Sequence, residues 1–546
     1  MRCRWAGAQA DDAEVARAVV DRIVAHVLAG NPRDAAPAVH EVLGEALFHE
    51  RSRLEHASGQ RADADREFWA GVARALRHAG AERSAKLLRE VVARYAGEIR
   101  GHFDARVYAV ATRALPVSLS ALLNGLSPAH LVAHAGDLPN LEENVVLEGE
   151  IDTLRALARV GTIILAPTHS SNLDSLLLGF AIYRMGLPPF SYGAGLNLFT
   201  NPMTSFFMHH LGAYTVDRSK TDPLYRATLK EFATVLLEHG RHNLFFPGGT
   251  RSRSGEVETH LKKGLLGTGV VAFKNNLRAG AERPRVFVVP ATATYPLVLE
   301  ARSLVADFLE KTGRGLYLPA VDEFNLLHRW IDFLRGLLRL RLRIRLVIGK
   351  PLDPFGNDVD AEGVSRDGRG RPVDPARYLL VDGAIGDDPE RDAEYTCGLV
   401  PAVLRAYRAD TVALPTAILA FAVFERLRRS APRLDLYRLL RSPSDELTLP
   451  VAEVASDVER LLGDLRALAR DGRIRVSDEA ADAATVVRRG LETFGTYHPV
   501  PVIERSADNL RVGDANLVFF YRNRLEGYGL DGSRPALPPD HSAHRV

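Results

Sequence analysis

The stretch Thr162-Ile163-Ile164-Leu165-Ala166-Pro167-Thr168-His169-Ser170-Ser171-Asn172-Leu173-Asp174 contains the feature that decides the fold. Its apolar run, residues 162–165, is typical of a buried strand in an α/β sheet. His169 and Asp174 follow the predicted end of that strand, and open α/β sheets bind ligands at the carboxyl ends of their strands. A histidine with an orienting carboxylate at this place indicates proton abstraction from a hydroxyl group.

The five-residue spacing of His169 and Asp174 allows contact in one arrangement. Five residues on a helix turn through about 500°, so the pair would not share a helix face. The two side chains can meet if His169 lies in a loop and the helix begins near Ser171 or Asn172, which are both good N-caps. Asp174 would then fix the imidazole tautomer. A loop histidine with its own hydrogen-bond partners, followed by an aspartate that the helix dipole favours in the first turn, would have the same spacing. The spacing alone therefore does not decide between a catalytic pair and two unrelated structural residues.

Residues 146–355 alternate short β-rich runs with helices. This alternation predicts an α/β domain with a mostly parallel sheet flanked by helices. The clearest helix runs from Asp222-Pro223 to Gly240, since aspartate suits the N-cap, proline the first helical position and glycine the end. The candidate strands are 162–166, 213–216, 243–246, 286–290 and 343–348.

The region before the α/β domain, residues 1–145, predicts a helical N-terminal domain. Valine and isoleucine recur at helical spacing after Asp11-Asp12, which suits a helix start. A second helix is expected over 84–96, with Gly97 placed to end it. No catalytic signature occurs here, so a packing or regulatory role is the default.

The region after the α/β domain divides into two parts. Residues 356–397 are polar and rich in turn residues, which predicts a linker or hairpin. Residues 398–546 predict a mostly helical C-terminal domain. Within it, 447–476 has the pattern helix, helix, short strand, which is compatible with a DNA-binding winged helix but is also common elsewhere. No nucleic-acid partner is expected.

Composition limits the class of protein. The chain has 546 residues, more than one hydrophobic core usually supports, so two or three domains are expected. A formal charge of +2 gives no case for a general nucleic-acid binder. Two cysteines, Cys3 and Cys397, exclude a disulfide framework, and the first five residues lack the apolar core of a signal peptide. We therefore expect a cytoplasmic protein.

Two neutral stretches bear on membrane attachment. Residues 185–216 contain no charged Asp, Glu, Lys or Arg but are broken by proline and glycine, and 411–424 is too short to cross a bilayer. No transmembrane helix is therefore expected. Both stretches predict either buried core or a surface that meets lipid or an acyl chain at the cytoplasmic face of the membrane. The large apolar residues behind the second interpretation are Phe199, Phe206, Phe207 and Met208.

Three further clusters occur at or just after predicted strands. Arg218 ends the run 212–218, Arg251 and Arg253 lie in the glycine-rich run 245–255, and the run 288–295 ends in proline and small residues. Guanidinium groups bind phosphate or carboxylate with two hydrogen bonds, and glycine lets a ligand approach the backbone. An exposed arginine-rich turn would look the same, so each cluster is ambiguous alone.

In their order, the four clusters resemble the four sequence blocks of the glycerolipid acyltransferases, and the third is most similar to the glycerol-3-phosphate acyltransferase branch. The resemblance covers roughly residues 160–300 and has weaker support from 348–351. The matching blocks are His169…Asp174 (the His-x4-Asp block), Gly212…Arg218, Phe246…Gly255 and Val289-Pro290…Tyr295.

This resemblance implies a reaction. A fatty acyl group would pass from acyl-CoA or acyl carrier protein to the sn-1 hydroxyl of glycerol 3-phosphate, with His169 as base and Asp174 behind it. No metal and no cofactor beyond the acyl co-substrate is implied, and the membrane surface is the expected setting. Substrate-binding residues would be Arg218, Gly249, Arg251, Ser252, Arg253 and Pro290. Lys262 and Lys263 would contact the phosphates of coenzyme A or the acidic carrier, unless they are only an exposed basic helix start.

The third block departs from the family at one position. The family pattern is Phe-x-Glu-Gly-x-Arg-Ser-Arg-x-Gly, and Gly248 stands where the pattern has glutamate. The resemblance implies that this glutamate helps to hold the glycerol substrate or positions the neighbouring arginine. Loss of such a charge-assisted contact is worth about 1.5–3 kcal/mol. Two alternatives stay open: another acceptor, such as lysophosphatidate or dihydroxyacetone phosphate, or a non-catalytic lipid- or DNA-associated regulator.

Overall fold

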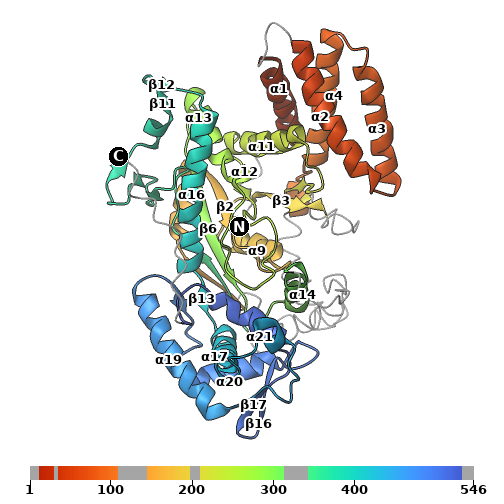
Figure 1. Ribbon diagram of the computed structural model, residues 1–546. Helices are drawn as coiled ribbons and strands as arrows, with labels where there is room; N and C mark the ends of the chain where they lie inside the picture. Colours follow the sequence, from red (N-terminus) through yellow and green to blue (C-terminus); the bar gives the residue numbers. More distant parts are fainter. Residues whose placement is uncertain (1–11, 30–34, 109–143, 197–209, 313–341, 532–546) are drawn as a thin grey trace, which may run out of the picture.

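The computed structural model consists of a helical bundle, a central α/β domain and a C-terminal region (Figure 1). The bundle lies at the top of the view, above α11, and the C-terminal region, in blue, lies at the bottom. The structure describes residues 12–29, 35–108, 144–196, 210–312 and 342–531.

The central sheet has seven strands in the order β1-β7-β6-β2-β5-β3-β4. Strands β6, β2, β5, β3 and β4 are parallel neighbours, while β7 runs antiparallel to β6 and parallel to β1. The expected mostly parallel sheet is thus confirmed, and two strands, β1 and β3, are additional to the prediction. The strands are β1 (Val145–Gly149), β2 (Thr162–Pro167), β3 (Ser191–Gly195), β4 (Ala213–Val216), β5 (Asn243–Leu244), β6 (Val286–Thr294) and β7 (Ile344–Ile348).

Helices cover both faces of the sheet, which explains why β2 is a continuous apolar run. Ile163 and Leu165 pack into the hydrophobic core on one face, and Ile164 and Ala166 into the core on the other. The first face carries α8 (Ile151–Val160), α9 (Asp174–Arg184) and α14 (Ala301–Lys311), and the second carries α12 (Lys263–Leu266), α13 (Thr268–Arg278) and α16 (Pro389–Ala409).

The N-terminal bundle packs on the α/β domain through α11 (Pro223–Glu238). Asp222 caps α11 by accepting from the backbone N–H groups of Leu224 and Tyr225, as the sequence predicted, and the Tyr95 hydroxyl donates to its Oδ2 at 2.7 Å. The bundle consists of α1 (Asp12–Ala29), α2 (Ala35–Glu55), α3 (Gln60–Leu76) and α4 (Ala81–Ile99).

One predicted helix end in the bundle is wrong. Helix α4 continues through Gly97 to Ile99 instead of ending there. Tyr95, Ala96 and Ile99 are buried in the bundle core, and this burial outweighs the cost of about 1 kcal/mol for a glycine within a helix.

The C-terminal region shares one hydrophobic core with the first face of the sheet. Helix α17 (Pro415–Ser430) lies at its centre, and residues 411–424 are all buried, so the buried interpretation of that stretch is confirmed.

Residues 447–476 differ from the predicted order of helix, helix and short strand, because they form one strand, one long helix and a second strand. These are β14 (Thr448–Pro450), α19 (Val451–Arg470) and β15 (Arg475–Val476), followed by α20 (Ala483–Phe494), β16 (Ile503–Ser506), β17 (Asn509–Val512), α21 (Ala515–Arg522) and the 3-10 turn η4 (Asn523–Leu525).

Between the two domains the chain forms short strand pairs. The expected boundary at residue 397 falls inside α16, which runs from Pro389 to Ala409. The pairs are β8 (Asp358–Val359) with β9 (Ser365–Arg366), β9 with β10 (Pro372–Val373), and β11 (Leu380–Val381) with β12 (Ala384–Ile385). Strand β13 (Val412–Ala413) follows α16 and pairs with β15 of the C-terminal region.

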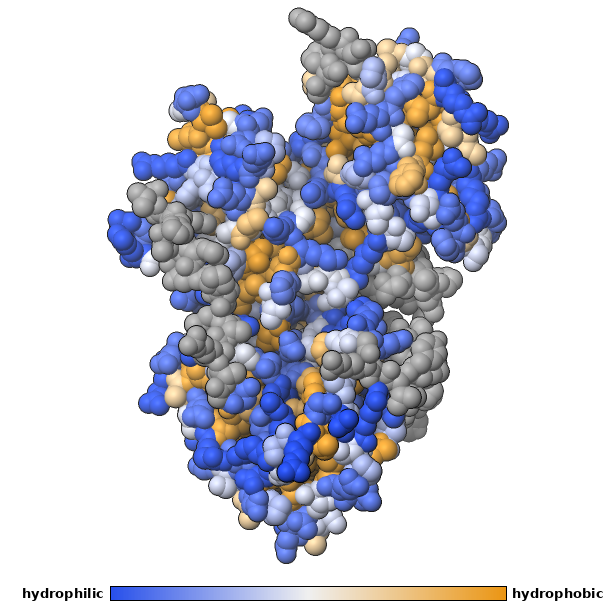
Figure 2. Space-filling model, in the orientation of Figure 1, coloured by the Kyte–Doolittle hydropathy of each residue, from blue (hydrophilic) through white to orange (hydrophobic). Residues whose placement is uncertain are grey.

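None of the described helices is long and apolar enough to cross a bilayer. Hydrophobic residues on the face shown in Figure 2 occur in separate patches among hydrophilic ones. Phe199, Phe206, Phe207 and Met208, which carried the lipid-contact interpretation, lie outside the described residues.

A buried ionic junction joins the bundle to the loop that carries Arg218. Lys220 is 4% exposed, and its Nζ lies 2.9 Å from Glu98 Oε2 and 3.5 Å from Glu50 Oε1. Arg53 also pairs with Glu50, at 2.6 Å. The junction therefore fixes the loop after β4 against two helices of the bundle.

Replacing Lys220 by methionine should destabilise the protein, because the carboxylates of Glu50 and Glu98 would lose a cation in a poorly solvated place. We expect a loss of about 3 kcal/mol, at the low end for a broken buried pair because Arg53 remains. The measurement is the denaturant midpoint of unfolding. Lys230→Met, on an exposed position of α11, is the control and should change stability by less than about 0.5 kcal/mol. Equal midpoints for the Lys220 variant and the wild type would contradict the prediction.

Candidate active site

His169 and Asp174 are in contact beyond the carboxyl end of β2. The His169 Nδ1 and Asp174 Oδ2 atoms are 2.8 Å apart. Asp174 is fully buried, whereas the His169 side chain is 15% exposed. Because an ionised carboxylate only accepts hydrogen bonds, Nδ1 carries the proton and the Nε2 lone pair is available to another group. Among the described residues, no three His, Cys, Asp or Glu side chains are grouped to hold a metal ion.

The helix after His169 starts later than predicted. It begins at Asp174 and not near Ser171 or Asn172. Ser171 instead forms a turn, in which its Oγ accepts from the N–H of Leu173 at 3.2 Å. Asp174 folds back over this turn, and its Oδ2 accepts from the N–H groups of Ser170 at 2.7 Å and Ser171 at 2.9 Å. The turn therefore holds the carboxylate toward the imidazole.

Tyr295 completes the surroundings of Asp174. Its hydroxyl donates to Asp174 Oδ1 at 2.5 Å. Burial and the negative charge of Asp174 raise the pKa of Tyr295 well above its usual value, so the hydroxyl stays protonated and remains a donor. Sequence reasoning placed Tyr295 only at the end of the fourth sequence block and gave it no contact with Asp174. The available signal was its position just past β6, the strand that pairs with β2.

One face of the imidazole packs on an aromatic ring. His169 stacks on Phe246 with ring centroids 4.1 Å apart and an interplanar angle of 20°. Phe246 precedes the glycine-rich loop, whose Ser252 N–H donates to the His169 carbonyl at 2.8 Å. The first and third sequence clusters are therefore in direct contact, although about 80 residues separate them.

Two buried or partly buried glutamates, which sequence reasoning missed, brace the same loop. Glu258 Oε1 accepts from the His169 N–H at 2.6 Å. Glu300 accepts from the Ser171 hydroxyl at 3.0 Å and from the Asn172 N–H at 2.8 Å. Burial raises the pKa of both glutamates, and the hydrogen bonds to the loop oppose that rise. No spacing signal identified either glutamate, because both act through contacts with segments distant in sequence.

The three predicted arginines gather near one another. The pKa of Arg218 is lowered by partial burial of its guanidinium and by the positive charges of Arg251 and Arg253. Arg251 Nη1 is 3.4 Å from Glu300 Oε1, and Arg253 Nε is 2.6 Å from Asp307 Oδ2. Within the described part of the chain, Arg218 has no hydrogen bond or ion pair. A cluster of like charges with one free guanidinium favours an anionic ligand.

The two lysines expected to contact the acyl donor, Lys262 and Lys263, point to different parts of the structure. Lys262 lies against Gly249, where an added Cβ would come within 2.6 Å of Lys262 Cε. Gly249 has a φ of +77°, which also favours glycine at this turn. Lys263 points toward α16, with its Nζ 3.1 Å from the Sγ of Cys397. Only Lys262 therefore lies at the glycine-rich loop.

Two further predicted substrate-binding residues have structural contacts. The Ser252 hydroxyl donates to the carbonyl of Glu256 at 2.8 Å. Pro290 is a central residue of β6, where its carbonyl accepts from the N–H of Gly349 at 2.9 Å. The structure therefore places Pro290 inside the sheet, below the loop that carries His169.

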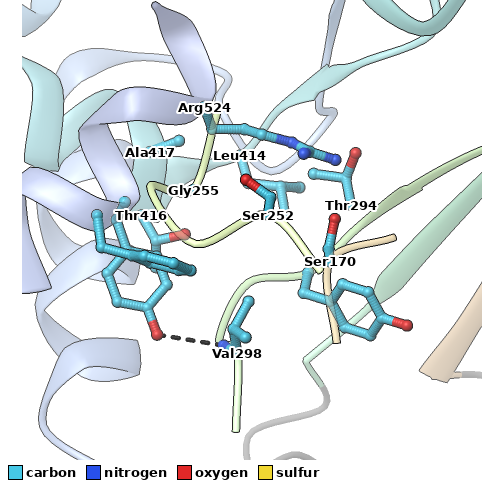
Figure 3. A pocket seen from close by; sticks show the side chains of 12 residues that line it. Ser170, Ser252, Gly255, Thr294, Val298, Leu414, Thr416, Ala417 and Arg524 are labelled. Atoms are coloured by element: carbon cyan, nitrogen blue, oxygen red, sulfur yellow. Dashed lines mark hydrogen bonds between the residues drawn. The ribbon is translucent and has the colours of Figure 1, made fainter. Parts of the chain in front are cut away.

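The C-terminal region reaches the site through η4. Arg524 donates to the carbonyl of Ala293 at 2.5 Å, and Asn523 Nδ2 donates to the carbonyl of Ser254 at 2.8 Å. Figure 3 shows Arg524 crossing the loop with Ser252 toward Thr294. Sequence reasoning found no site residue after 398. The cavity between these parts has a volume of about 30 Å³, enough for about one water molecule, and is lined by Ser170, Ser252, Gly255, Thr294, Tyr295, Val298, Leu414, Thr416, Ala417, Phe520, Tyr521 and Arg524.

Comparisons with known proteins agree with this geometry. The Acyltransferase family model matches residues 150–293, which contain the first three clusters and most of the fourth. The chain is 31% identical over 225 residues to a protein named glycerol-3-phosphate acyltransferase from Pseudomonas paraeruginosa, a match that covers 41% of this chain and 24% of the relative. Proteins of the same name match from Actinobacillus succinogenes (33% identity, 33% of this chain and 22% of the relative) and Ectopseudomonas mendocina (29%, 60% and 38%).

The matched part of the chain thus spans between 22% and 38% of the length of these relatives. The match is centred on the strands, loops and arginines that surround His169 and Asp174. Residues 150–293 therefore form a domain that matches the Acyltransferase family.

Proposed function

We propose that the protein transfers a fatty acyl group from acyl-CoA or acyl carrier protein to the sn-1 hydroxyl of glycerol 3-phosphate. The product is lysophosphatidate, which serves phospholipid synthesis. The observation that carries the proposal is the His169–Asp174 contact of 2.8 Å beside a cluster of three arginines. The relatives named glycerol-3-phosphate acyltransferase support the choice of acceptor.

In this proposal His169 is the general base. Its Nδ1–H donates to Asp174, so Nε2 removes the proton of the acceptor hydroxyl while the oxygen attacks the thioester carbonyl carbon. The carbon–sulfur bond then breaks and the thiolate leaves. Because a thiol has a pKa of about 8.5, departure of the thiolate needs little help from an acid. General-base catalysis of this kind contributes about 10²–10⁴-fold.

The arginine cluster holds the phosphate of the acceptor. Arg218 is the principal contact, because Arg251 and Arg253 are already paired with Glu300 and Asp307. Lys262, which lies over the glycine-rich loop, contacts a phosphate of coenzyme A or an acidic residue of the carrier protein. Gly248 favours a second candidate, transfer to lysophosphatidate or dihydroxyacetone phosphate, because the family glutamate is missing there.

We also propose that the protein works at the cytoplasmic membrane surface. Leu176 and Tyr183 are exposed on α9, the helix that begins at Asp174, and their spacing of seven residues places them on one helix face.

We expect the wild type to float with phosphatidylcholine–phosphatidylglycerol vesicles in a density gradient. The Leu176→Asp/Tyr183→Asp variant should float less, because it places two charges on the apolar helix face. Val500→Asp, at an exposed position of the C-terminal region, is the control. Recovery of all wild-type protein in the soluble fraction would count against membrane attachment.

His169→Ala should reduce acyl transfer by at least about 10²-fold, because the substitution removes the imidazole that takes the hydroxyl proton in this proposal. The measurement is incorporation of labelled glycerol 3-phosphate with palmitoyl-CoA as donor. Tyr295→Phe is the graded comparison, since it removes one of the donors to Asp174 and leaves the base in place. We expect a loss of about tenfold for that variant. Equal product from wild type and His169→Ala would end the catalytic proposal.

Arg218→Ala should raise the KM for glycerol 3-phosphate by about tenfold to hundredfold, the equivalent of one charge-assisted contact. The KM for palmitoyl-CoA should change little, because the phosphate of the acceptor is the group affected. Arg226→Ala, at an exposed position of α11, is the matched control. A similar rise in both KM values, or none, would be inconsistent with an acceptor-binding role.

A further inference from the structure

The space next to Gly248 is occupied by a side chain from ten residues further along the chain. A Cβ added to Gly248 would lie 3.1 Å from Glu258 Cγ and 3.6 Å from Glu258 Oε1. Gly248 is not among the residues with positive φ, so its backbone does not itself require glycine. The carboxylate of Glu258 therefore lies where a side chain at position 248 would project, at the position where the family pattern has glutamate.

A compact loop brings Glu258 to this place. The Lys262 N–H donates to the carbonyl of Pro247 at 2.7 Å, which closes the loop at its base. The hydrogen bond from the Ser252 hydroxyl to the Glu256 carbonyl, at 2.8 Å, holds the two halves of the loop together. The segment with Glu258 thus returns beside Gly248.

The two oxygens of Glu258 have different surroundings. Oε1 accepts from the backbone N–H of His169 at 2.6 Å. Oε2 is shielded from solvent and has no hydrogen-bond partner among the described residues. An unpaired buried carboxylate oxygen is costly, so a site that binds a hydroxyl-bearing ligand gives it a natural partner.

The charge of this carboxylate is balanced from the C-terminal region. Burial raises the pKa of Glu258, whereas the His169 N–H and the positive charge of Arg524 oppose that rise. Burial in turn lowers the pKa of Arg524, and the negative charge of Glu258 is the strongest of the charges that oppose it. The positive charge of Arg524 therefore partly opposes the effect of burial on the carboxylate next to the proposed base.

We propose that Glu258 replaces the glutamate that is missing at position 248. Its Oε1 positions the backbone of His169, and its Oε2 accepts a hydrogen bond from the non-reacting hydroxyl of a diol acceptor. The proposal rests on the acyltransferase function proposed above and narrows its substrate class. Glycerol 3-phosphate has a second hydroxyl that can donate to Oε2, whereas dihydroxyacetone phosphate has a carbonyl there, which cannot donate.

A two-position exchange tests the replacement. Glu258→Ala should lower the kcat/KM for glycerol 3-phosphate about tenfold to hundredfold, as expected for a lost charge-assisted contact. Gly248→Glu alone should also lower it, because two carboxylates would crowd one space. The double variant Gly248→Glu/Glu258→Ala should regain most of the activity, which is a coupling between the sites that independent effects cannot give. Glu256→Gln, on the same loop, is the control and should retain wild-type kcat/KM.

The preference between two acceptors distinguishes a substrate contact of Glu258 from a purely structural role, because a structural role would not change that preference. Glu258→Gln keeps the shape of the side chain but replaces one oxygen by an NH2 donor. We expect it to reduce the ratio of kcat/KM for glycerol 3-phosphate over dihydroxyacetone phosphate about tenfold. Denaturant midpoints of all variants identify any that fail to fold, and the Gln variant is the conservative test in that case.

The outcomes separate this proposal from the function on which it rests. An active wild type whose double variant is no better than Glu258→Ala, or whose acceptor ratio is unchanged in Glu258→Gln, would overturn the role of Glu258 and leave the acyltransferase proposal standing. A wild type without activity on any of the acceptors would overturn both proposals.

Discussion

The buried carboxylate of Asp174 is the constraint on which the rest of the site depends. Removal of a charge from water is costly unless hydrogen bonds replace the lost solvation. Asp174 has four such bonds, from the Ser170 and Ser171 N–H groups, the His169 ring and the Tyr295 hydroxyl. The donors come from the segments that follow β2 and β6, so the pairing of these two strands sets the geometry of the base. Any shift in that pairing would separate Asp174 from Tyr295.

The flanking regions are tied to this centre by charge. The N-terminal bundle holds the loop after β4, which carries Arg218, through Lys220 and two glutamates. The C-terminal region contributes Arg524, a buried cation in the field of Glu258 and Asp174. The family match ends at residue 293, yet the Arg524 guanidinium bonds the carbonyl of that same residue, Ala293. The acyltransferase domain is thus surrounded by regions that complete its electrostatics.

The sequence predicted those elements whose formation depends on residues close together in the chain. The apolar run of β2 and the cap and proline of α11 are of this kind. Strand β3, with the sequence Ser-Tyr-Gly-Ala-Gly, lacks the β-branched residues that mark strands and exists because β4 and β5 pair with it. The antiparallel direction of β7 depends on a connection that no spacing reveals. Glu258 and Glu300 could not be predicted either, because each acts on the His169 loop from a distant part of the chain.

The glycine at position 248 has a different meaning in the sequence motif and in the structure. From the sequence, it indicates the loss of a carboxylate and therefore a change of acceptor or of activity. In the structure, the missing side chain leaves a space that the Glu258 carboxylate fills at van der Waals distance. A substrate interacts with a charge at a given place in the site, whichever residue supplies it. A carboxylate from position 258 can therefore serve where the family pattern has one at position 248. If Glu258 takes that role, the departure from the family pattern is a relocation of the charge within one loop, where the His169 N–H and the positive charge of Arg524 both oppose the effect of burial on the carboxylate.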